Sequence, residues 1–157
     1  MSVEERFVRL VSTGLGTGLV PHAPGTAGTL VGIPLFLVFA QMSWQLHLLS
    51  ILALSLLAVY VSGAAEKALD RKDAPCIVID EIVGFQFTML FIPPTLLHIV
   101  LGFIAFRIFD ITKPFPIGLC ERKIPGGWGI VADDIMAGIY ARATLALLLA
   151  AMGAYIP

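Results

Sequence analysis

The sequence contains few charged residues and only two cysteines. Of its 157 residues, 13% are charged and 58% are hydrophobic, whereas an ordinary soluble domain has about 25% charged and about 45–50% apolar residues. This composition excludes a disordered chain and argues against a purely water-soluble one. Two cysteines are too few for a disulfide framework or a zinc site, and the net charge of −1 offers no basic surface for nucleic acid. The length predicts one domain, residues 1–157, and the mixed charges at the N-terminus predict that no signal peptide is removed.

The charged residues gather in three segments that are separated by long uncharged stretches. No Lys, Arg, Asp or Glu lies between Arg9 and Glu66, between Glu81 and Arg107, or after Arg142. A charge in hydrocarbon costs about 2.5–3.5 kcal/mol on insertion scales. We therefore expect the uncharged stretches to lie in a membrane while the charged segments share one aqueous face. Basic residues favour the cytoplasmic side, so this face is predicted to be cytoplasmic.

The uncharged stretches predict helices. Trp44–Ser62 is almost wholly aliphatic and close to the ~20 residues that a helix needs to cross a bilayer. Leu30–Phe39 is predicted to pair with it in a helical hairpin that turns near residues 41–43. The stretch Ile82–Phe106 is interrupted by Pro93-Pro94, and two prolines predict a break into two helices of about three turns each. These two helices are short for separate crossings, so they are expected to be re-entrant or buried in protein.

A last helix is expected from about Asp134 to Tyr155, after a flexible glycine-rich loop at Pro125–Gly129. In the charged run before the second stretch, Asp73 precedes Ala74-Pro75 and is predicted to cap a helix. Alternating strand patterns are scarce, and the best of them is the short run Cys76–Ile79. The predicted fold class is therefore all-α, a compact helical membrane-associated domain with short helical hairpins.

Five carboxylates interrupt otherwise apolar sequence, and they are Asp80, Glu81, Asp110, Asp133 and Asp134. Carboxylates with apolar neighbours lose water on packing and need partners. Several oxygen donors that converge from separate segments suit a hard divalent cation such as Mg²⁺. The alternatives are that Asp80, Asp133 or Asp134 caps a helix and that Asp110 pairs with Arg107 on one helical face. Five such acids in a chain with so few charges favour a metal site.

Two further motifs point to an anion. Gly25, Thr26, Gly28 and Thr29 lie in a Gly/Thr loop that opens a helix, where backbone N–H groups and hydroxyls suit a phosphate. The loop lacks the Lys of a Walker A motif, and it could equally be a simple turn. Lys113 follows Asp110 by three residues and could neutralise a phosphoryl oxygen. The alternative for Lys113 is a lysine that reaches the membrane surface with its aliphatic stem buried.

Four blocks of the sequence together resemble the phosphatidylglycerophosphatase A family, in the family's order and over nearly the whole chain. They are Ala23–Thr29, Ile79–Gly84, Phe106–Ile117 and Gly126–Gly138. The departures are mild: Phe115 stands where the family often has tryptophan, and Ile79 where a tryptophan precedes the acids. Neither departure removes a polar group, so they concern contacts with lipid rather than the chemistry.

The resemblance implies a Mg²⁺-dependent phosphatase, integral to the bacterial inner membrane, with its active site facing the cytoplasm. Its substrate would be phosphatidylglycerophosphate, whose terminal phosphate is removed to leave phosphatidylglycerol in phospholipid biosynthesis. The implied ligands of one or two Mg²⁺ ions are Asp80, Glu81, Asp110, Asp133 and Asp134. The same five acids and Lys113 form the implied catalytic set. The implied phosphate-binding residues are Gly25, Thr26, Gly28, Thr29, Arg107 and Lys113.

Two other classes of protein fit parts of the same pattern. A small transporter or channel subunit would use the acids to coordinate a passing cation. It predicts acids inside the spanning segments, whereas the sequence places them at segment ends. A non-catalytic membrane-assembly protein would use the acids only for capping and pairing. The oligomeric state is left open by the sequence.

Overall fold

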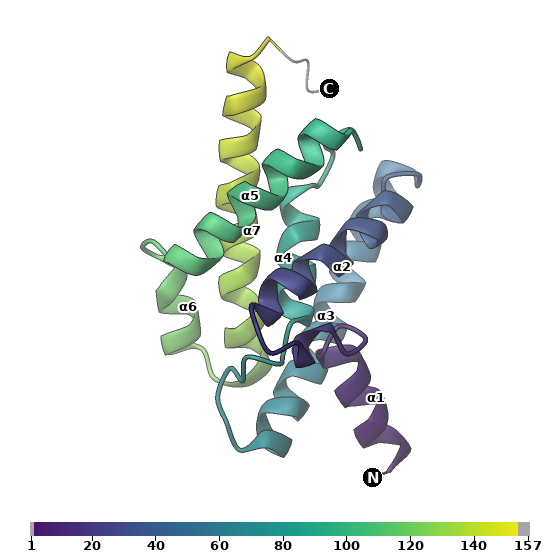
Figure 1. Ribbon diagram of the computed structural model, residues 1–157, viewed down its shortest axis with the longest axis vertical. Coiled ribbons are helices and arrows are strands. Elements are labelled where there is room, and N and C mark those ends of the chain that lie inside the picture. The colour runs from purple at the N-terminus through teal and green to yellow at the C-terminus, as the bar shows by residue number, and fades with distance from the viewer. Residues whose placement is uncertain (1, 154–157) are drawn as a thin grey trace.

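The computed structural model describes residues 2–153, apart from the side chain of Glu121, and it is built from helices (Figure 1). In chain order they are α1 (Val3–Ser12), the short 3-10 helix η1 (Thr17–Leu19), α2 (Pro24–Phe39), α3 (Trp44–Leu69), α4 (Ile79–Thr88), α5 (Leu96–Thr112), α6 (Ile117–Lys123) and α7 (Gly126–Ala151). The described residues contain no strand. The all-α prediction is confirmed.

Helix α4 forms the centre of the molecule. Eight of its ten residues are buried, and α2, α3, α5 and α7 surround it (Figure 1). Helices α4 and α7 meet backbone to backbone, because a Cβ added to Gly138 would lie 2.3 Å from the carbonyl oxygen of Gly84. This close approach brings the middle of α4 beside the middle of α7.

Buried polar side chains tie α4 and the turn that follows it to the neighbouring helices. The amide of Gln86 donates to the carbonyl oxygen of Gly32 in α2 at 2.9 Å. The hydroxyl of Thr88 lies 3.1 Å from the carbonyl oxygen of Gly84 in its own helix and 3.4 Å from that of Gly138 in α7, so it can donate to either. The Nε of Arg142 in α7 donates at 2.8 Å to the carbonyl oxygen of Leu90, just after α4 ends. These bonds satisfy backbone carbonyls in a largely apolar interior, where an unpaired polar group is costly.

Helices α3 and α7 are each long and apolar enough to cross a membrane. Each has 26 residues and is therefore ~39 Å long at ~1.5 Å per residue, against a hydrocarbon core of ~30 Å. The outer side of α3 exposes Leu49, Leu52 and Leu56. An exposed aliphatic stripe on a spanning helix is what contact with lipid requires.

The predicted hairpin and the predicted proline break are both confirmed. Helices α2 and α3 are joined at residues 40–43, although α2 begins six residues earlier than expected, at Pro24. Helix α4 ends at Thr88 and α5 begins at Leu96, so Pro93 and Pro94 lie between them. With 17 residues, α5 is longer than the predicted three turns.

The glycine-rich segment after Pro125 is not a loop, and that prediction is wrong. It forms the first turns of α7, so neither Asp133 nor Asp134 caps a helix. A Cβ on Gly127 would lie 1.9 Å from the carbonyl oxygen of Val59. The glycine therefore lets α7 press against α3, and this tertiary contact outweighs the low helix propensity of glycine. The predicted end of this helix at Tyr155 lies outside the described residues.

The predicted helix cap at Asp73 is also wrong. Asp73 lies in a turn with φ of 45°, and α4 begins only at Ile79. A left-handed backbone is tolerated by Asp in turns, so the short polar side chain here marks a turn rather than a helix start.

Candidate active site

The five predicted carboxylates come from three helices that converge at the start of α4. Asp80 and Glu81 lie in the first turn of α4, Asp110 lies near the end of α5, and Asp133 and Asp134 lie in α7. Asp80, Asp110, Asp133 and Asp134 are buried, and Glu81 is half-buried. The structure therefore brings together side chains as far apart in the sequence as Asp80 and Asp134, which are separated by 54 positions.

Three of these acids form a group that could hold one metal ion. Asp80, Glu81 and Asp134 each offer a carboxylate oxygen, and the three oxygens lie within 4.8 Å of one another. Oδ1 of Asp80 and Oε2 of Glu81 are buried and have no hydrogen-bond partner in the described structure. Buried oxygens without partners are rare because each costs desolvation energy. This arrangement suits a cation that supplies the missing partner.

The other two acids are paired with cations. Nη1 of Arg107 donates to Oδ2 of Asp110 at 2.5 Å and lies 3.9 Å from Oε1 of Glu81. Nζ of Lys113 donates to Oδ2 of Asp133, also at 2.5 Å. The structure thus separates Asp110 and Asp133, which orient cations, from the three acids that lie closer together.

The charges in this cluster are not balanced by its own residues. Burial raises the pKa of Glu81 to about 8, and the negative charge of Asp110 contributes to the shift. Burial also raises the pKa of Asp80 well above its usual range, with the charge of Glu81 as the next cause. Both carboxyl groups favour the protonated form as they stand. A bound cation is the kind of partner that would keep them ionised at neutral pH.

The Gly/Thr loop reaches this cluster only through its first residues. A Cβ on Gly25 would lie 2.1 Å from Oε1 of Glu81 and 3.1 Å from Nη1 of Arg107. The N-terminus of α2 therefore touches the acids and the guanidinium, and Thr26 follows in the same turn. Gly28 instead faces Val78, and the buried hydroxyl of Thr29 donates to the carbonyl oxygen of Gly25 at 2.8 Å.

Two glycines that position the acids had no role in the sequence analysis. A Cβ on Gly84 would lie 2.6 Å from the carbonyl oxygen of Asp134 and 2.5 Å from the ring of Phe106. Gly84 and Gly138 together set how close Asp80 and Asp134 can come. Their signal was their place inside two of the four blocks that resemble the family, Ile79–Gly84 and Gly126–Gly138, but glycine spacing in a sequence does not reveal which helices will touch.

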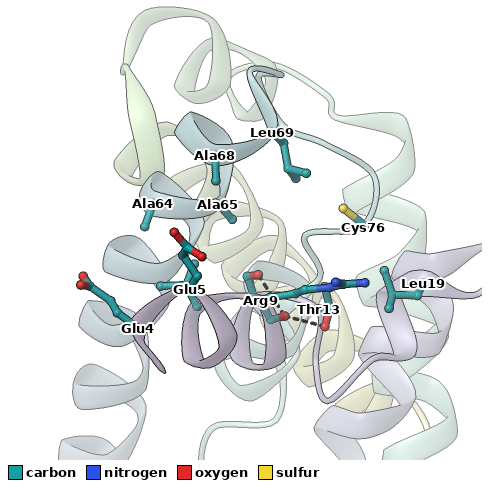
Figure 2. A pocket seen from close by; sticks show the side chains of 12 residues that line it. Glu4, Glu5, Arg9, Thr13, Leu19, Ala64, Ala65, Ala68, Leu69 and Cys76 are labelled. Carbon is teal, nitrogen blue, oxygen red and sulfur yellow. Dashed lines mark hydrogen bonds between the residues drawn. The ribbon is translucent and has the colours of Figure 1, made fainter. Parts of the chain in front are cut away.

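One groove of the described structure lies away from these acids. It has a volume of about 640 Å³ and lies between α1 and the end of α3 (Figure 2). Figure 2 shows Ala64, Ala65 and Ala68 along one side of it, with Glu5 and Arg9 projecting from α1. The unpaired oxygens and the converging charges therefore identify the candidate site, and the size of a cavity does not.

Comparison with known proteins shows the family of the chain. The family model described as Phosphatidylglycerophosphatase A matches residues 10–149. The chain is 37% identical over 131 residues to phosphatidylglycerophosphatase A of Escherichia coli (strain K12). The aligned residues cover 83% of this chain and 76% of that protein. It is 35% identical over 136 residues to phosphatidylglycerophosphatase A of Haemophilus influenzae, covering 85% of this chain and 83% of that protein.

A third relative carries a different name. The chain is 32% identical over 140 residues to a Bacteroides thetaiotaomicron protein provisionally named phosphatidylinositol-3-phosphatase, covering 83% of this chain and 86% of that protein. No solved structure matches the chain.

Proposed function

Because the chain belongs to the phosphatidylglycerophosphatase A family and is a phosphatase, we propose that it hydrolyses the terminal phosphate of phosphatidylglycerophosphate. The products would be phosphatidylglycerol and inorganic phosphate, which makes this a step of phospholipid biosynthesis. Phosphate-monoester hydrolysis is extremely slow without a catalyst, and its barrier falls chiefly through positioning and charge neutralisation. The observation that carries the proposal is the group of three close carboxylates beside the guanidinium of Arg107 at the N-terminus of α2.

We propose that the cofactor is one Mg²⁺ ion held by Asp80, Glu81 and Asp134. The donor set fits this ion, because Mg²⁺ prefers oxygen ligands and commonly uses few carboxylates together with water and substrate phosphate. The unpaired oxygens of Asp80 and Glu81 fit it as well. When bound, the ion would polarise the phosphate and lower the pKa of a coordinated water.

The remaining charged residues of the site have roles that follow from their contacts. Asp110 holds the guanidinium of Arg107 through Nη1, and the buried Nε of Arg107 has no hydrogen-bond partner in the described structure. The guanidinium can therefore bind a phosphoryl oxygen while it stays oriented. Lys113 is held by Asp133 and places a second positive charge at the same site. In this proposal Asp110 and Asp133 act through these cations and not as metal ligands.

We propose that the protein lies in the bacterial inner membrane with this site toward the cytoplasm. The end of α3 and the start of α7 both carry charged neighbours, and the first turn of α7 contacts α3 at Val59 and Gly63. Lys67, Arg71 and Lys72 lie there, and basic residues in short segments favour the cytoplasmic side.

The test is phosphate release from phosphatidylglycerophosphate by the purified full chain in mixed micelles. Activity should require Mg²⁺ and disappear with a chelator. Asp80→Asn and Asp134→Asn should each lower kcat by at least about 100-fold, equivalent to about 2.7 kcal/mol, while the protein stays folded in detergent. Asp70→Asn is the matched control, since Asp70 is an exposed carboxylate at the end of α3.

Phosphatidylinositol 3-phosphate should be tested beside the first substrate because of the third relative. Faster turnover of that lipid would overturn the proposed substrate and keep the phosphatase. Full activity of both Asn variants, or release that survives the chelator, would overturn the metal site.

A further inference from the structure

Helix α1 has an apolar face that no other segment within residues 2–153 covers. Val3, Phe7 and Leu10 recur at helical spacing, so they lie on one side of the helix. Their exposed fractions are 85%, 47% and 51%. The opposite face carries Val8 and Ser12, which are buried, and the helix packs on α3. Helix α1 is thus attached to the bundle by one side and presents apolar side chains on the other.

A hydrogen bond fixes the level at which α1 meets the candidate membrane helix α3. The hydroxyl of Tyr60 donates to Oε1 of Glu4 at 2.9 Å. Tyr60 is itself exposed, and it follows Leu56 in the stripe of exposed side chains along α3. Tyrosine is enriched where spanning helices leave the hydrocarbon, because its ring is apolar and its hydroxyl is polar.

The second candidate membrane helix marks the same level. The first turn of α7 presses against Val59, and the next residue of that turn, Trp128, is 60% exposed. Tyr60 and Trp128 therefore stand at the same height on two adjacent long helices. Two exposed aromatic residues at one height are typical of the membrane–water interface. Helix α1 joins the bundle at this height, and Figure 1 shows it beside the lower part of α3.

The charges of α1 suit the surface of a membrane. Glu4 accepts the hydrogen bond from Tyr60, and Glu5 forms the capping box with Ser2. Arg6 and Arg9 are exposed, and Arg6 lies beside the apolar face by helical spacing. A long basic side chain in that position can reach lipid phosphates while its stem stays on apolar surface.

We propose that α1 rests on an anionic lipid surface, with Val3, Phe7 and Leu10 among the acyl chains and Arg6 beside the lipid phosphates. The hydrogen bond between Tyr60 and Glu4 places α1 next to the exposed stripe of α3, and this proximity favours lipid over a protein partner. The inference rests on the proposed membrane placement of the chain and not on the phosphatase reaction. It assigns α1 a role as an interfacial anchor on the side where the carboxylates lie.

The test measures the position of single spin labels on the full chain in vesicles of phosphatidylcholine and phosphatidylglycerol. The two native cysteines are first replaced by Cys76→Ala and Cys120→Ala, and one nitroxide is then attached after Phe7→Cys or Leu10→Cys. Arg9→Cys is the matched control, since it lies on the same exposed helix nearly opposite Phe7. Collisions with O₂, which partitions into the bilayer, are compared with collisions with a water-soluble Ni²⁺ chelate.

Labels at positions 7 and 10 should collide more with O₂ than with the chelate, and the label at position 9 should show the reverse. Equal water exposure at all three positions would overturn the proposal. Protection of positions 7 and 10 from both reagents, together with spin–spin broadening between chains, would also overturn it, because the face would then contact a second copy. None of these readouts depends on phosphatase activity, so failure of the proposed reaction would not be mistaken for failure of the anchor.

Discussion

Replacing Gly25 with alanine should separate catalysis from folding. The added Cβ would lie 2.1 Å from Oε1 of Glu81. A tolerable separation is at least about 3.0 Å, so the carboxylate oxygen must retreat by about 0.9 Å (3.0 minus 2.1). The obstacle is the tip of a flexible side chain, which can move without disturbing the backbone. Because a displacement of about 1 Å in a catalytic arrangement can cost about 10²-fold in rate, kcat should fall by about two orders of magnitude, or about 2.7 kcal/mol.

The stability of the Gly25→Ala protein should change by less than about 1 kcal/mol, since the higher helix propensity of alanine offsets the cost of moving Glu81. The assays are phosphate release as a function of Mg²⁺ concentration and thermal unfolding in detergent. Wild-type kcat with unchanged Mg²⁺ dependence would refute the reasoning, because Glu81 would then have no function in the position that the structure gives it.

Two other glycines provide controls with the same chemical change. A Cβ on Gly118 in α6 has its nearest neighbour at 3.5 Å, an ordinary contact, so Gly118→Ala should keep both activity and stability. A Cβ on Gly138 would lie 2.3 Å from the backbone oxygen of Gly84. That atom cannot move without separating α4 from α7, so Gly138→Ala should unfold the protein at lower temperature as well as inactivate it.

Three further predictions follow from the charges and the backbone of the site. Lys113→Met should cost about 1–3 kcal/mol in thermal unfolding because it leaves the buried Asp133 without this partner, and adding Asp133→Asn should restore most of the stability but not the activity. Since the folded pKa of Glu81 is raised to about 8 from 4.5, the protonated form is favoured in the fold. Without divalent cation, the free energy of unfolding should therefore fall as pH rises between those values. Addition of Mg²⁺ should restore the stability at pH 8. Glu81→Gln should remove most of this dependence on pH, as measured by thermal unfolding. Ala23 has φ of 49° at the cap of α2, a left-handed conformation that costs about 1–2 kcal/mol for a residue with a Cβ. Ala23→Gly should therefore raise the unfolding temperature. A lower unfolding temperature would contradict the argument.

The sequence was sufficient to predict the helical class and which carboxylates the fold would bring together. Long uncharged stretches exclude strands with alternating polarity. The adjacent Pro93 and Pro94 remove two backbone N–H donors in a row and break the helix, whereas the single Pro34 lies inside α2. Likewise, carboxylates such as Asp80 and Asp134 within apolar sequence must find partners whatever the tertiary arrangement. These are local constraints, and each follows from residues that are adjacent in the chain.

Only the tertiary structure determined which acids are paired with cations and which lie together as a group that could hold a metal ion. Asp110 and Asp133 look like Asp80 and Asp134 in the sequence, yet the first two are paired with Arg107 and Lys113. The glycine-rich segment at the start of α7 is typical of a loop by propensity, yet it is helical, because glycine there lets α7 contact α3. Pairing and close approach depend on distances between helices that are far apart in the chain, and no spacing along one segment encodes such a distance.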